Sequence, residues 1–394
     1  MINVGTLRAS AFALVAVFAA SNAYAQDANA VAQRLKDTFA EQGADIGWSA
    51  VTGGGSNIVI ENATIKPAGE AAPFTIGNVK LDGVAEANGG YTVETVTFPE
   101  IKFADKGVTI TGTAATLNKM RIPAAGQTNF LDQMLLYESG KLDHVEVKQG
   151  DKVVASVDNT HFEMPAPVDG KLSFTSTADK FSADLTTIPD PQTQAIISAL
   201  GYQQITGKAQ MDGSWNLKDG QMQISKYEIA VDNAAKINFT FDIGGYTPEL
   251  MKAMQDISKQ VAKTPNGDNS AQSVAMLGLM QQLLFNGASI RIDDDSLTNK
   301  ALDFVAKQQG ADASQLKEQT KTIIPFLLAS SPIKDEALKK QITDAVAAYI
   351  DNPKSLTITA KPAQPQPFSA IAMQGQADPA SLTTTLGVSV TAND

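Results

Sequence analysis

Three consecutive aspartates, Asp293, Asp294 and Asp295, could bind a divalent cation or supply paired carboxylates for acid and base catalysis. A calcium loop of the EF-hand type also needs a central glycine and a closing glutamate, and the segment DDDSLTNKALDF contains neither at the required distance. The same residues suit the start of a helix, because acids stabilise its positive end and Asp295 or Ser296 can cap it. We therefore predict a helix N-terminus here and no metal site.

The other usual catalytic groups are scarce. Histidine occurs only at positions 144 and 161, in alternating sequence typical of strand surfaces, and no G-x-S-x-G motif or zinc-type histidine pair accompanies it. Cysteine is absent, which excludes thiol nucleophiles, thiolate metal sites and disulfides. We expect no catalytic residue, no cofactor and no metal, although a hydrolase that uses paired carboxylates stays open as an alternative because acids are plentiful.

Flexible hydrophobic side chains are the remaining candidates for function. Two expected helices, at residues 248–261 and 274–285, carry Met and Leu, which can line a cavity for a hydrophobic ligand. The proposed lining residues are Met251, Met254, Leu277, Met280 and Leu284. A dry core between helices and sheet would use the same residues, and that interpretation is left open.

The N-terminus has the order of a secretory signal peptide. Arg8 precedes an apolar run from Ala11 to Ala20, and Ala23-Tyr24-Ala25 provides small residues for cleavage after Ala25. The run is shorter than the roughly 20 residues that a bilayer span requires. We expect residues 1–25 to be removed and the protein to reach the bacterial periplasm, with secretion into the medium as the alternative.

The expected mature chain is acidic. Cleavage removes only Arg8 among the charged residues, which leaves 30 basic and 42 acidic residues and a net charge of −12. Nucleic-acid binding is disfavoured because phosphate recognition depends on basic side chains. No later apolar stretch is long enough to span a membrane, so we expect no integral membrane segment.

Period-two alternation dominates residues 26–245 and indicates half-buried antiparallel strands. A first helix is expected at residues 28–43, where Val31, Leu35 and Phe39 recur every four residues. A second, short helix is expected after Asp190 and Pro191, with Gly201 at its C-terminal end. A hairpin turn is predicted at residues 149–151. The alternating stretches are NIVIENATIK, FTIGNVKLDGV, YTVETVTFPEIKF, GVTITGTAATLN, KLDHVEVKQGDKVVASVDNTHFEM, KLSFTSTADKFSADL, KAQMDGSWNLKDGQMQISKYEIAV and KINFTFDIGG.

Residues 246–394 are expected to form a helical block with closing strands. Helices are predicted at 248–261, 274–285, 296–309, 313–330 and 335–350, with the strand ASIRI between the second and third. Two strands, SLTITAKP and TTTLGVSVTAND, end the chain. The proline-rich stretch between them is expected to be a long loop or a flap.

Together these elements predict an α+β fold. A large, mainly antiparallel sheet would be a meander covered on one face by the helical block, and the last strands would rejoin the sheet. The strand-rich region 26–245 and the region 246–394 would form one continuous structural unit.

Several segments carry a resemblance to known proteins. With ALGYQQITG, GSWNLKDGQMQI, FDIGGYT, LGLMQQLLFNGASIRIDDDSLTNKALDF and the terminal GVSVTAND, the chain resembles a family of uncharacterised secreted proteins of Gram-negative bacteria. Its meander is more loosely similar to AsmA-like envelope proteins, from which it departs because no retained membrane anchor is expected. The resemblance implies an envelope role and no catalytic residues.

We therefore expect a non-enzymatic periplasmic protein of envelope maintenance that binds a hydrophobic ligand, such as a lipid, or an envelope protein. A purely structural envelope scaffold and a carboxylate-based hydrolase are the alternatives.

Overall fold

The computed structural model describes residues 27–67, 72–127, 131–263 and 268–394, so the expected signal peptide lies outside the described residues. The chain divides into two compact units, residues 1–178 and 179–394. The boundary expected at residue 245 falls inside the second unit. Each unit combines helices with an antiparallel sheet, which agrees with an α+β fold.

The first unit starts with helix α1 (Ala28–Glu41), as the four-residue spacing predicts. Asp27 caps this helix by accepting a hydrogen bond from the backbone N–H of Asn29. The strands that follow are β1 (Ala44–Gly47), β2 (Ala50–Gly54), β3 (Asn57–Pro67), β4 (Phe74–Asp82), β5 (Ala85–Ala87), β6 (Gly90–Thr97), β7 (Ile101–Asp105), β8 (Val108–Gly112), β9 (Ala115–Ile122), β10 (Ser139–Gln149) and β11 (Lys152–Glu163). Strand β12 (Lys171–Asp184) runs through the boundary between the units.

The sheet of the first unit follows the chain closely. Strand β3 pairs with β4, β4 with β6, β6 with β9 and β9 with β10, all antiparallel. Strands β10 and β11 form the predicted hairpin, with its turn at residues 150–151. Helix α1 packs against β1, β2 and β9, and its Val31 is fully buried against the sheet. The helix therefore covers an apolar sheet face, on which Leu81, Val93 and Ile122 are also fully buried.

The second unit contains the remaining elements. Its strands are β13 (Gln204–Asn216), β14 (Met222–Val231), β15 (Ala235–Gly244), β16 (Leu284–Asp294), β17 (Ser355–Ala360), β18 (Gln366–Pro367) and β19 (Val388–Ala392). Its α-helices are α2 (Pro191–Leu200), α3 (Pro248–Lys263), α4 (Ser270–Met280), α5 (Leu297–Gln308), α6 (Ala313–Ala329), α7 (Glu336–Asp351), α8 (Phe368–Ala377) and α9 (Leu382–Thr385).

Neighbouring strands of this sheet pair antiparallel in the order β13, β14, β15, β16, β17 and β19. The prediction that the last strands rejoin the sheet is confirmed, because β19 pairs with β17, and β17 with β16. The predicted caps of α2 are confirmed as well: the side chain of Asp190 accepts from the N–H of Thr193, and Gly201 has a φ of 77°.

Two predictions in this region are wrong. The helix expected at residues 274–285 ends at Met280, and Leu284 and Phe285 begin strand β16. Phe285 is buried between the rings of Phe241 and Phe368, a tertiary contact that overrides the local helical pattern. The proline-rich connection is also not a plain loop, because it contains β18 and α8, and α9 follows it where the last strand was expected to begin.

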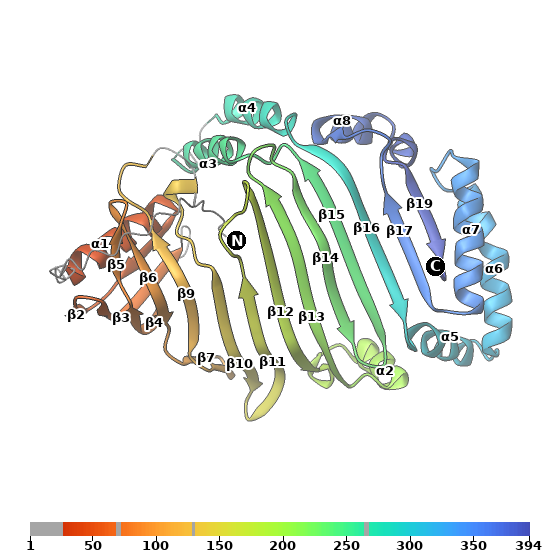
Figure 1. Ribbon diagram of the computed structural model, residues 1–394. Helices are drawn as coiled ribbons and strands as arrows, with labels where there is room; N and C mark the ends of the chain where they lie inside the picture. The colour runs from red at the N-terminus through yellow and green to blue at the C-terminus, as the bar shows by residue number, and fades with distance from the viewer. Residues whose placement is uncertain (1–26, 68–71, 128–130, 264–267) are drawn as a thin grey trace, which may run out of the picture. The chain divides into compact units, whose positions relative to one another are not determined.

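The helices of the second unit lie around the margin of its sheet (Figure 1). Helices α3, α4 and α8 lie at one end of the strands, and α2 and α5 lie at the other end. Helix α7 packs along β19, the edge strand, and α6 packs on α7. This arrangement differs from the expected helical cover over one face of the sheet.

Among residues 27–394, leaving aside 68–71, 128–130 and 264–267, no helix combines the length and apolar character that a membrane crossing requires.

Candidate functional site

One face of the second sheet is apolar from β13 to β19. Because side chains alternate across a strand, residues that pair across the ladder share a face. One row of paired residues consists of Met211, Tyr227, Phe239, Ile290, Ile358 and Val390. The next row consists of Ala209, Ile229, Ile237, Ile292, Leu356 and Ala392. We call these two rows the apolar face.

Several side chains of the apolar face remain open to solvent. Ile237 is 49% exposed, Ile290 47% and Ile358 46%, although aliphatic side chains in the centre of a sheet are normally covered. These three residues lie on neighbouring strands, so the exposure is contiguous and not scattered. Contiguous exposed apolar surface on a protein is typical of a binding site.

A hollow of about 370 Å³ lies on this face at strands β13 to β15. Bulges at Asp212/Gly213 and at Ile224/Tyr227 interrupt the ladder here, and Gly213 places no side chain opposite Ile224. The residues that line the hollow are Met211, Ile224, Tyr227, Ile229, Ile237 and Phe239. Tyr227 is the only one of these residues whose side chain has an oxygen or nitrogen atom, so the hollow suits an apolar group.

The residues predicted to line a hydrophobic site lie elsewhere. Met251 and Met254 are on α3, Leu277 and Met280 on α4, and Leu284 is the first residue of β16. Helices α3 and α4 contact each other, so these residues gather at one end of the second sheet. The hollow on β13 to β15 is lined by none of them.

The three aspartates have separate structural roles. Asp294 Oδ2 accepts from the backbone N–H of Thr298 at 2.9 Å and from its hydroxyl at 2.8 Å, which caps the first turn of α5. The prediction of a helix N-terminus is confirmed, and Ser296 occupies the N-cap position. Its side chain makes no capping hydrogen bond, however, because it donates to the backbone carbonyl of Asn233, and Asp295 is exposed.

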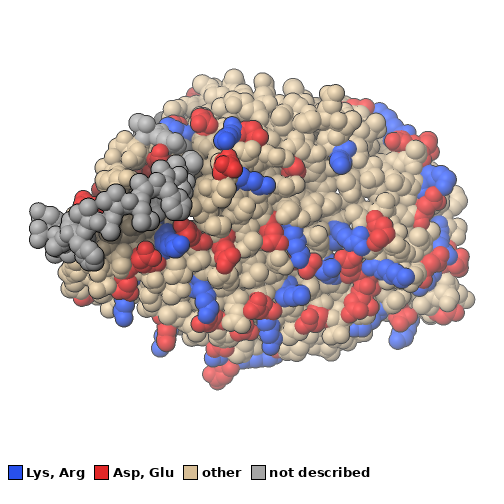
Figure 2. Space-filling model, in the orientation of Figure 1, with Lys and Arg blue, Asp and Glu red and all other residues tan. Residues whose placement is uncertain are grey.

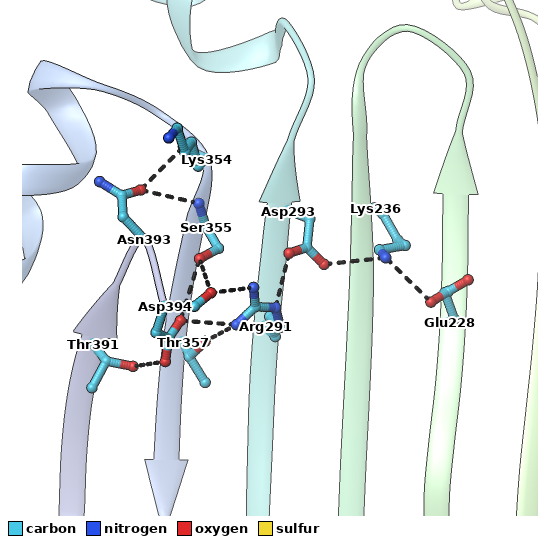
Figure 3. A network of polar contacts seen from close by, with 10 residues as sticks. All are labelled: Glu228, Lys236, Arg291, Asp293, Lys354, Ser355, Thr357, Thr391, Asn393 and Asp394. Carbon is cyan, nitrogen blue, oxygen red and sulfur yellow. Dashed lines mark hydrogen bonds and ion pairs between the residues drawn. The ribbon is translucent and has the colours of Figure 1, made fainter.

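Asp293 belongs to a polar network on the opposite face of the sheet (Figure 3). Its carboxylate accepts from Arg291 Nε at 2.8 Å and pairs with Lys236 Nζ at 3.4 Å. The guanidinium of Arg291 also donates to Oδ1 of Asp394, at 2.9 Å. The hydroxyl of Thr391 and the guanidinium of Arg291 hold the pKa of the Asp394 carboxyl below its usual value. These charges neutralise one another, and Figure 2 shows such mixed acidic and basic side chains on the visible face.

Both histidines of the first unit lie close to carboxylates, which their sequence pattern does not predict. His144 Nδ1 lies 2.5 Å from Oδ1 of Asp158, its partner across the β10–β11 hairpin. The hydrogen bond with Asp158, followed by the charges of Asp158 and Glu146, raises the pKa of the His144 imidazole. His161 Nε2 lies 3.0 Å from Glu163. Each histidine therefore has a carboxylate partner on the sheet surface.

A second hollow, of about 570 Å³, lies within the first unit beside β6 and β9. Four of the charged side chains around it form two pairs: Lys119 with Glu138 at 3.0 Å, and Arg121 with Asp132 at 3.6 Å. Within the described ranges, no group of three or more His, Asp or Glu side chains is placed to hold a metal ion. The chemistry of this hollow is thus that of a paired, polar surface.

The sequence contains a signal for the apolar face. Segments IAV, INFTF, SIRI and LTITA place apolar residues at every second position, and neighbouring strands repeat this without interruption. The pattern shows that a face is apolar. It does not show whether a helix covers that face.

Comparisons with known proteins give little further identification. A family model with the description "Uncharacterized protein" matches residues 228–393. A search of curated proteins finds no match. The matched segment runs from β14 to the residue after β19, and so includes most of the strands that carry the apolar face.

Proposed function

We propose that this protein is a non-enzymatic binding protein for a lipid acyl chain, which would lie on the apolar face of the second unit. The exposure of Ile237, Ile290 and Ile358 on three adjacent strands carries the proposal. Each of these side chains would gain roughly 1 to 2 kcal/mol on leaving water, so a bound acyl chain would stabilise the face considerably.

The hollow between β13 and β15 supports an acyl chain over a polar ligand. Its lining offers aliphatic and aromatic carbon together with the thioether of Met211. The Tyr227 hydroxyl is the one strong hydrogen-bonding side-chain group there, and it would suit the ester end of a lipid.

The cellular setting of the proposal comes from the sequence. The signal-peptide pattern with cleavage after Ala25 favours the periplasm, and the strand pattern resembles AsmA-like envelope proteins. A role in envelope maintenance follows from these two features, with a lipid as the ligand and an envelope protein as the alternative partner.

The test compares two substitutions at adjacent positions of β15. Ile237→Glu places a charge in the hollow, and Asn238→Glu places the same side chain on the opposite, polar face. Binding is measured by displacement of an environment-sensitive naphthylamine probe with a fatty acid, and by native mass spectrometry of the purified protein for lipid.

We expect the wild type to bind the probe and release it to the fatty acid. Ile237→Glu should weaken binding by at least about tenfold, because desolvating a carboxylate is costly, whereas Asn238→Glu should bind like the wild type. Circular dichroism checks that both variants fold. Equal binding by the two variants, or no binding by the wild type, would contradict the proposal.

A further inference from the structure

The end of the second unit formed by α4 and α8 combines apolar exposure with an absence of charge. Residues 270–290 contain no Asp, Glu, Lys or Arg, and neither do residues 362–377, in a chain of which 19% is charged. Helices α4 and α8 contact each other and lie along the same edge (Figure 1). In Figure 2 this upper edge is mostly tan. We call this surface the neutral end.

Helix α4 has the composition of a buried helix without being buried. Residues 274–280 are all apolar or glycine, so the helix presents apolar side chains in every direction. A helix of that kind is normally enclosed by protein or lipid. None of its residues is buried, however, and Val274 is 69% and Leu277 56% exposed.

Helix α8 extends the same surface. Its Met373 is 64% exposed, whereas Phe368 at its start packs edge-to-face on Phe285. Serine, glutamine and small residues surround the exposed aliphatic side chains in both helices. The neutral end therefore offers a few protruding hydrophobic side chains set among uncharged polar ones.

We propose that the neutral end docks on the surface of a lipid bilayer, with Val274, Leu277 and Met373 inserted among the lipid chains. Charge favours this orientation: the protein carries −11 overall, whereas α4 and α8 have no acid to be repelled by anionic headgroups. The neighbouring helix α3 has acids at Glu249 and Asp256, and Asp256 is paired with Lys252. Because α4 and α8 have no Lys or Arg either, the attraction does not depend on anionic lipid.

A protein partner fits this surface less well. A stable protein interface buries about 800 Å² on each side and is anchored by Tyr, Trp or Arg. Neither α4 nor α8 contains any of these three residue types, and only three of their large side chains protrude strongly. Shallow insertion into lipid needs no such area or shape complementarity.

Docking at the neutral end would also bring the apolar face close to a source of lipid, and this one point rests on the proposed function. Helix α4 leads into β16, and α3 follows β15, so the strands that carry the apolar face have their ends at the neutral end. A lipid that leaves a bilayer there would meet the open apolar face directly.

Co-flotation of the full chain with vesicles of pure phosphatidylcholine tests the docking. The double variant Val274→Asp/Leu277→Asp carries two charges on α4, and Met373→Asp carries one on α8. The matched control is Phe326→Asp/Leu327→Asp on α6, where the side chains are 71% and 60% exposed. Because all these positions are exposed, the variants should fold, which circular dichroism verifies.

We expect the wild type and the α6 control to float with the vesicles. The α4 double variant should lose at least about tenfold in partitioning, and Met373→Asp a smaller factor. Three results would overturn the proposal: a wild type that does not float, an α4 variant that floats unchanged, or a wild-type dimer in light scattering that the α4 variant dissociates. The last result would assign the neutral end to a second copy of the chain.

The variant Ile237→Glu separates this inference from the proposed function. It should float normally although it binds the probe more weakly, because the charge lies in the hollow and not on α4 or α8. Flotation without probe binding in the wild type would leave the docking standing and remove the ligand. Loss of flotation in Ile237→Glu would instead place the membrane contact on the apolar face and contradict docking through the neutral end.

Discussion

The strands of the two units follow the same sequence rule and reach opposite outcomes. In the first unit, helix α1 packs on the apolar face, and Leu81 and Val93 in the same core cluster are fully buried. In the second unit, helices surround the sheet at its ends and edge, and Ile237 and Ile290 on the apolar face stay about half exposed. Both faces arise from the alternation of apolar and polar residues along antiparallel strands.

The difference shows what alternation does and does not determine. A closed face stabilises its own unit, because its side chains leave water on folding. The side chains of an open face stay in contact with water after folding, so they contribute less to stability. They leave water only when a ligand covers the face. Substitutions on the two faces should therefore have unequal effects on stability.

The largest effect is expected at the closed face. Leu81→Ala should lower the free energy of unfolding of the first unit by about 2 to 5 kcal/mol, because it removes buried methyl groups and leaves a cavity. The two tryptophans of the chain allow each unit to be observed separately, since Trp48 lies in the first and Trp215 in the second. Urea unfolding followed by Trp48 fluorescence in a Trp215→Phe background measures the change. A cost below about 1 kcal/mol would mean that α1 does not close this face tightly.

A smaller effect is expected at the cap of α5, at the margin of the open sheet. Asp294→Ala should destabilise the second unit by about 1 kcal/mol, because two hydrogen bonds to Thr298 are lost. Asp295→Ala, at the exposed neighbour, is the matched control and should change stability by less than about 0.5 kcal/mol. Trp215 fluorescence during urea unfolding compares them. If Asp295→Ala cost more than Asp294→Ala, the capping role would belong to Asp295.

This pair of aspartates illustrates how far the sequence predicts the structure. Local signals placed the start of α5 correctly, because acids before an apolar periodic run mark a helix N-terminus. They did not identify the capping side chain, because Asp294, Asp295 and Ser296 all suit that role chemically. The choice depends on Asn233 and Tyr202, which are distant in sequence and engage Ser296 instead.

The candidate site was less predictable than the fold. The recurrence of flexible apolar residues on helices predicts a hydrophobic site at Met251 and Leu277. The apolar face lies instead on strands, each of which shows only the usual alternation of apolar and polar residues. Its exposure depends on where α3 to α8 pack, and packing between distant segments has no local signature. The start of β16 at Leu284, where a helix was expected, has the same origin, because Phe285 is held by Phe241 and Phe368.

A still smaller effect is expected at the open face. Ile237→Thr should change the stability of the second unit by less than about 0.5 kcal/mol, because the side chain is half exposed and threonine favours strands. The same variant should bind the naphthylamine probe more weakly, which separates the roles of the residue in binding and in folding. A loss of stability as large as that of Leu81→Ala would show that the two faces are equally closed.

The two units carry different ionisable groups on the polar side of their strands. The first unit places His144 against Asp158 and Glu146, and the second joins Arg291, Asp293 and Asp394. Among the described residues, both histidines belong to the first unit. Only the first unit should therefore respond to pH near neutrality through a histidine.

The direction of that response follows from the raised pKa of His144. The folded state binds the proton more tightly than the unfolded chain, so the contribution is complete below the ordinary value of 6.5 and is lost as the pH rises through the folded pKa. We expect unfolding reported by Trp48 to shift to lower urea as the pH rises above 6.5, and His144→Gln to remove this shift. Trp215 serves as the internal control, because Asp394, with its lowered pKa, stabilises the second unit above the usual carboxyl range and loses that effect only as the pH falls through its folded pKa. A shift of equal size at both tryptophans, or one that persists in His144→Gln, would mean that the two polar faces do not titrate separately.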